Sequence, residues 1–110
     1  MPEPIETHPA DPTAPIACTA TADRAAGQVR EWSDLQQRAL DRREIDGGVR
    51  LVLPAELTDR VRDLARREAA CCSFLTISTI VEDDLLIVEV TAIDEAARPI
   101  IAMLAGGGPS

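Results

Sequence analysis

The side chains best suited to chemistry in this sequence are the three cysteines, Cys18, Cys71 and Cys72, together with Glu68. Cysteine thiolates are nucleophiles and ligands for soft or borderline metals. A neighbouring carboxylate can complete a metal site or transfer protons. Cys71 and Cys72 lie one helical turn beyond Glu68, so we expect these three side chains to be neighbours.

A helix predicted from about residue 56 to 72 positions three of these side chains. At about 100° per residue, its apolar stripe consists of four residues: Leu57, Val61, Leu64 and Ala65. Glu68 falls at the centre of this stripe, and Cys71 and Cys72 fall on either side of it. The sequence therefore predicts a carboxylate that faces the core between two thiols.

Three explanations for a core-facing Glu68 are open. Burying an unpaired carboxylate costs several kcal/mol, so the group must find a compensating interaction. It could reach water or an arginine such as Arg30 or Arg50, or accept hydrogen bonds from backbone amides. Alternatively, Glu68 acts as a metal ligand or a proton-transfer group beside the thiols.

The cysteines have an equally simple alternative, since buried cysteines often only fill space. A disulfide between Cys71 and Cys72 would strain the peptide that joins them. On the last turn of a helix the two sulfurs diverge, so a metal held by both requires the helix end to unwind. Cys18, on a strand predicted at residues 15–20, is the natural third thiol.

This pattern predicts soft-metal or metalloid binding as the function, with zinc, copper(I), mercury(II) or arsenite as the ion. The expected ligands are Cys18, Cys71, Cys72 and Glu68. Two alternatives use the same residues: a small cysteine-dependent enzyme with Glu68 as general acid or base, and a thiol redox sensor. A structural domain without chemistry also remains open.

The hydrophobic pattern predicts an α+β fold of order β-α-β-α-β-β-α. We expect a two-layer sandwich in which a four-stranded, mostly antiparallel sheet carries the helices on one face. The expected strands are residues 15–20, 49–53, 75–81 and 85–90, and the expected helices are residues 22–43, 56–72 and 95–105. The turn 82–84 joins the last two strands, and Asp94 caps a final helix that Pro99 interrupts.

Residues 15–105 should form the single domain of this 110-residue chain. Four prolines and three acidic residues predict that residues 1–14, including the sole histidine, His8, are a disordered tail. Residues 106–110 should be a flexible tail. No secretory leader and no membrane span are expected, which predicts a cytoplasmic protein without membrane partners.

The charge and composition argue against direct binding to nucleic acid. The net charge is −8, and Trp32 and Phe74 are the only aromatic residues. All basic residues are arginines; four gather on the second helix, on a side expected to be solvated: Arg60, Arg62, Arg66 and Arg67. The expected partners are a metal ion or a small thiol-reactive ligand, with a homodimer or a regulator protein also possible.

Four segments together resemble a small, little-characterised bacterial domain that occurs alone or beside helix-turn-helix regulators of the mercury-resistance type. These are Ile16-Ala17-Cys18-Thr19, Glu31-Trp32, Gly47-Gly48-Val49-Arg50-Leu51 and Glu68-Ala69-Ala70-Cys71-Cys72-Ser73-Phe74. The resemblance covers about residues 15–105, and its most specific part is the Glu-x-x-Cys-Cys-x-Phe pattern. It implies a metal or thiol-reactive ligand.

Overall fold

The computed structural model describes residues 4–11, 13 and 22–105. Cys18, the strand predicted at residues 15–20 and the tail at 106–110 lie outside the described residues. The strands are β1 (Ile5–His8), β2 (Asp41–Ile45), β3 (Gly48–Pro54), β4 (Thr76–Glu82) and β5 (Leu85–Thr91). The helices are α1 (Ala22–Arg38), α2 (Thr58–Cys71) and α3 (Arg98–Ala105), with single 3-10 turns at Ala55–Leu57 and Glu95–Ala97.

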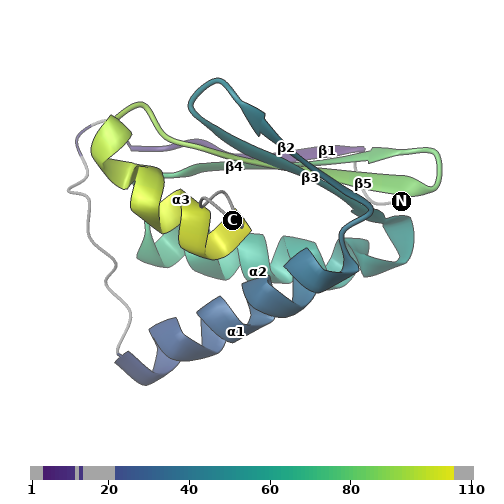
Figure 1. Ribbon diagram of the computed structural model, residues 1–110, viewed down its shortest axis with the longest axis horizontal. Coiled ribbons are helices and arrows are strands. Elements are labelled where there is room, and N and C mark those ends of the chain that lie inside the picture. The colour runs from purple at the N-terminus through teal and green to yellow at the C-terminus, as the bar shows by residue number, and fades with distance from the viewer. Residues whose placement is uncertain (1–3, 12, 14–21, 106–110) are drawn as a thin grey trace.

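The described strands form one antiparallel sheet in the order β1-β4-β5-β3-β2. All three helices lie on the same face of this sheet (Figure 1). The α+β class is therefore confirmed, whereas the prediction of four strands is wrong, because the sheet has five. The two strands absent from the prediction, β1 and β2, form the two edges of the sheet.

β1 lies within the segment predicted to be a disordered tail. It pairs with β4 in the register that places Ile5 opposite Ile80. The residues before and after β1 form further backbone hydrogen bonds. The Val81 amide donates to the Pro4 carbonyl, and the Asp11 amide donates to the Ser73 carbonyl. The prolines fall outside the four paired residues, so they remove no hydrogen bond from the strand.

β2 lies where the sequence suggested the end of the first helix. α1 ends at Arg38, and residues 41–45 pair with β3 through a turn at Asp46-Gly47, where Gly47 has a φ of 79°. An Asp-Gly pair favours such a turn because glycine adopts positive φ readily. Gly48 then packs so closely on the β5 backbone that an added Cβ would collide with the Val90 carbonyl.

The later elements agree with the sequence prediction. β4 and β5 form a hairpin, and Asp83 in its turn has a φ of 56°. The Asp94 side chain accepts a hydrogen bond from the Ala96 amide, as expected for a helix cap. Pro99, however, is the second residue of α3, where it removes no helical hydrogen bond and so does not interrupt the helix.

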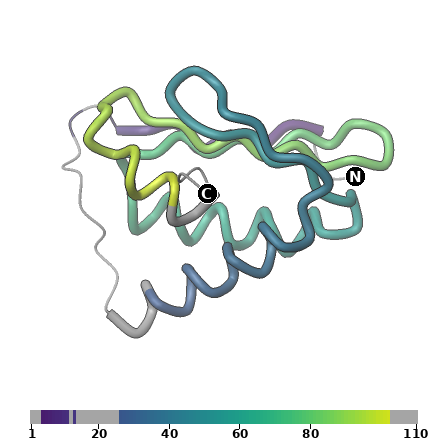
Figure 2. Tube along the Cα trace, in the orientation of Figure 1, coloured from purple at the N-terminus to yellow at the C-terminus, as the bar shows by residue number. Residues whose placement is uncertain are grey.

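The core lies between the sheet and the helices. Alternate residues of the three central strands point inward: Val49, Leu51, Leu53, Ile77, Leu86, Val88 and Val90. The helices contribute Trp32, Leu35, Val61, Leu64, Ala65 and Ile101, and the loop after α2 contributes Phe74 and Leu75. α1 and α2 run antiparallel (Figure 2). This arrangement brings Gln28 to Glu68.

Within the described part of the chain, no helix is long and apolar enough to cross a membrane.

Candidate functional site

Glu68 is buried at the position that the helical pattern predicts, with only 3% of its surface exposed. Gln28 Nε2 on α1 donates a hydrogen bond to one carboxylate oxygen of Glu68. Cys72 Sγ donates to the other oxygen over 3.8 Å. Among the arginines whose side chains the structure describes, none forms a salt bridge with Glu68; Arg50, for instance, pairs with Glu89 on the sheet at 2.7 Å. The carboxylate is therefore held by an amide and a thiol.

Burial raises the pKa of Glu68 above that of an ordinary glutamate, because a charged carboxylate is poorly solvated there. The hydrogen bonds from Gln28 and Cys72 and the positive charge of Arg67 act in the opposite direction, and they are too weak to cancel the effect of burial. Burial thus outweighs the interactions that favour the ionised carboxylate at this position.

The two thiols lie at the point where α2 ends. Cys71 is the last helical residue, and Cys72 has φ −121° and ψ 70°, so the backbone leaves helical geometry between the two sulfurs. Cys72 is thus the C-cap of α2, and its amide still donates to the Glu68 carbonyl. Cys72 is 2% exposed, whereas Cys71 is half-buried. Cys71 Sγ donates to Gln28 Oε1 over 3.8 Å.

Gln28 is the residue of this site that sequence reasoning missed. It is 6% exposed, and its amide joins the Glu68 carboxylate to the Cys71 thiol. A signal for it was present, since Gln28, Trp32 and Leu35 recur at the four- and three-residue spacing of one helix face. A polar residue on that buried face requires a polar partner.

Within the described residues, no three His, Cys, Asp or Glu side chains are arranged to hold a metal ion. This includes the described part of the predicted ligand set, Cys71, Cys72 and Glu68, which a chain of hydrogen bonds through Gln28 connects. Cys18, the fourth predicted ligand, lies outside the described residues.

Comparison of the chain with models of protein families, with curated proteins and with solved structures finds no match.

A hollow of about 300 Å³ is lined by Gly27, Gln28 and Glu31 of α1 and by Arg67 of α2. Arg67 forms salt bridges to Glu31, at 2.8 Å, and to Asp63, at 3.0 Å. The hollow lies against Gln28, whose amide contacts Glu68 and Cys71.

Arg62 departs from the prediction that it lies on a solvated side of the helix. Its side chain is 6% exposed, donates to Thr79 Oγ1 at 2.9 Å and lies 3.6 Å from Glu6 of β1. The helix turns this side toward β1, a strand that the sequence did not predict. His8, predicted to lie in a disordered tail, sits in the same strand, with its Nε2 3.9 Å from Glu6.

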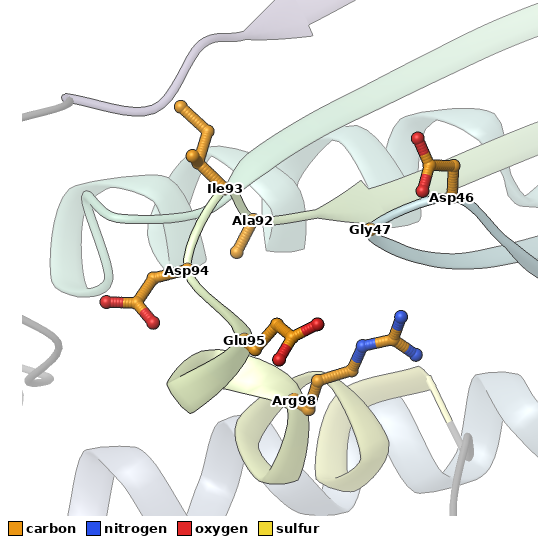
Figure 3. A pocket seen from close by; sticks show the side chains of 7 residues that line it. All are labelled: Asp46, Gly47, Ala92, Ile93, Asp94, Glu95 and Arg98. Atoms are coloured by element: carbon orange, nitrogen blue, oxygen red, sulfur yellow. The ribbon is translucent and has the colours of Figure 1, made fainter.

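A second hollow, of about 130 Å³, lies between the β2–β3 turn and the start of α3 (Figure 3). Its charged lining residues are Asp46, Asp94, Glu95 and Arg98. Asp94 is engaged in capping the 3-10 turn, and the Ile93 side chain points away from the hollow (Figure 3). None of the lining residues is a thiol or an imidazole, so we do not assign chemistry to this hollow.

Proposed function

We propose that Cys71, Cys72 and Glu68 bind a soft metal ion or metalloid, with Cys18 as the third thiolate ligand. The observation that carries the proposal is a buried carboxylate that accepts hydrogen bonds from Gln28 and from the Cys72 thiol, and whose pKa is raised by burial. A bound cation would supply positive charge beside this carboxylate, since buried carboxylates are otherwise costly.

The hydrogen bonds of the site suit an exchange of protons for an ion. Cys71 and Cys72 donate their thiol protons to Gln28 and Glu68, respectively. Binding of a divalent ion to three thiols releases three protons, and Glu68 can accept the proton of Cys72 as the metal–sulfur bond forms. With arsenite, three S–H groups replace three hydroxyls of arsenous acid and release three waters. We place this chemistry in the cytoplasm, where thiols stay reduced.

The test is titration of reduced, metal-depleted protein with zinc(II), copper(I), mercury(II) and arsenite separately. Native mass spectrometry should find about one equivalent of at least one of them, with thiols protected from a thiol reagent. Cys18→Ser, Cys71→Ser and Cys72→Ser should each weaken retention. Ser73→Ala, at an exposed position beside the pair, is the matched control. Full stoichiometry in the Cys18→Ser/Cys71→Ser double variant would refute the proposal.

A second candidate function is a cysteine-dependent reaction with Glu68 as general base. It is favoured by the Cys72–Glu68 hydrogen bond, which places a proton acceptor 3.8 Å from a thiol. In that case Cys72, although 2% exposed, should react with iodoacetamide faster than half-buried Cys71, and Glu68→Gln should slow it. Under the metal-binding proposal, Cys71 reacts faster because solvent reaches it.

A further inference from the structure

The outer face of the sheet, opposite the helices, carries a row of apolar side chains. The strand register aligns Val52 of β3, Ile87 of β5, Ile80 of β4 and Ile5 of β1 in one line across four strands. Ile5 is 54% exposed, and the other three are half-buried. No described element covers this face (Figure 1). A continuous apolar row on an uncovered sheet face is a candidate interaction surface.

The adjacent row on the same face is charged at its centre. Arg50 of β3 lies directly opposite Glu89 of β5, and their side chains form a salt bridge of 2.7 Å. The Arg50 side chain is 42% exposed and that of Glu89 is 26% exposed. β3 and β5 therefore present one positive and one negative group at the same position along the strands.

We infer that this face joins two copies of this chain, related by a two-fold axis that runs parallel to the strands between β3 and β5. Rotation about that axis places β3 of each copy opposite β5 of the other. Ile87 then faces the partner subunit's Val52, and Arg50 faces the partner subunit's Glu89. The same contacts recur on the other side of the axis, as an isologous interface requires.

The charge pattern favours a second copy over a different partner. Arg50 and Glu89 carry opposite charges on the two strands beside the axis. In the dimer the four side chains form a ring in which each arginine lies next to two glutamates and each glutamate next to two arginines. A uniformly acidic or basic partner would be repelled by one of the two. On the other side of the apolar row, Leu85 would meet the partner subunit's Pro54, which extends the apolar contact between the packed sheets.

The experiment is sedimentation equilibrium of reduced, metal-free protein over a range of concentrations. The parent protein should be a dimer. Glu89→Arg places like charges around the axis and should raise the dimer dissociation constant by at least about tenfold. The swap Arg50→Glu/Glu89→Arg should restore the dimer. Ile87→Asp should give a monomer with unchanged circular dichroism. Asp59→Arg, an equivalent charge reversal at an exposed position on the helix side, should leave the dimer intact.

Three results would overturn the inference: a parent protein that is monomeric at every concentration, a dimer that Glu89→Arg and Ile87→Asp leave unchanged, or a charge swap that fails to restore association. Because the measurement uses metal-free protein, its outcome is independent of whether Cys71 and Cys72 bind an ion.

Discussion

The amide of Gln28 on α1 bridges two side chains of α2, donating to the Glu68 carboxylate and accepting from the Cys71 thiol. The amide nitrogen faces the Glu68 carboxylate as a donor, and the amide oxygen is left as the acceptor for Cys71. The packing of α1 on α2 is thus tied to the polar chemistry at the end of α2. A change at any of the three residues should affect the other two.

Replacing Gln28 with alanine should destabilise the protein. Gln28→Ala leaves a buried carboxylate without its amide donor, which we expect to lower the free energy of unfolding by about 1–3 kcal/mol. Urea denaturation monitored by Trp32 fluorescence measures this change. Gln37→Ala, at an exposed position of the same helix, should change it by no more than about 0.5 kcal/mol. Equal effects of the two substitutions would contradict the bridging role.

Replacing Glu68 with glutamine should alter how stability depends on pH. Burial raises the native pKa of Glu68, so the folded state keeps this proton to higher pH than the unfolded chain does. The resulting stabilisation is fully present below the unfolded pKa and is lost as pH rises through the raised native pKa. Glu68→Gln cannot lose the proton.

We therefore expect the stability of Glu68→Gln, relative to the parent protein, to increase as the pH rises from below the ordinary glutamate pKa of 4.5 into the neutral range. Denaturant titrations of both proteins across this range provide the measurement. Glu82→Gln, at the exposed end of β4, is the matched control. A difference that stays constant with pH for Glu68→Gln would mean that its native pKa is not raised.

Two glycine-to-alanine substitutions should have opposite effects. In Gly48→Ala the new methyl group collides with the Val90 carbonyl, and we expect a loss of about 1–3 kcal/mol. In Gly27→Ala the methyl group has open space, with its nearest contact 4.0 Å away at Arg30, and α1 should gain about 0.5–1 kcal/mol. Thermal unfolding of the two variants checks both signs; a neutral Gly48→Ala would argue against the close β3–β5 approach.

Arg62 should matter more than its exposed neighbour Arg66, although both contact Glu6. Arg62→Met removes a buried partner of Glu6 and Thr79, which should cost about 2–3 kcal/mol. Arg66→Met removes a salt bridge from an arginine that is 57% exposed and should cost no more than about 1 kcal/mol. Urea denaturation ranks the two variants, and the reverse order would contradict the burial of Arg62.

Periodicity predicted the central strands and α2 because each buries one regular face. The alternation of Val49, Leu51 and Leu53 in β3 and the three- and four-residue spacing of Val61, Leu64 and Glu68 in α2 both correspond to residues that are buried. The burial of Glu68 was predictable for the same reason.

The edges of the sheet were not predictable from periodicity. β2 reads Asp-Arg-Arg-Glu-Ile and buries almost nothing, so its only sequence signal is the Asp46-Gly47 turn that folds it onto β3. β1 depends on Glu6 meeting arginines of α2, a contact between distant parts of the chain. Gln28 was missed because its role depends on how α1 packs against α2.

The short β1 strand also has a consequence for how the folded protein avoids self-assembly. It pairs with β4 along one edge of the sheet, through four residues from Ile5 to His8. Loss of these residues, by proteolysis for example, would leave a row of β4 amides and carbonyls without partners. Such an edge can template pairing with another chain, whereas β1 leaves a shorter edge that Pro4 and Pro9 flank, so the N-terminal strand should lower the tendency to fibril-like aggregation.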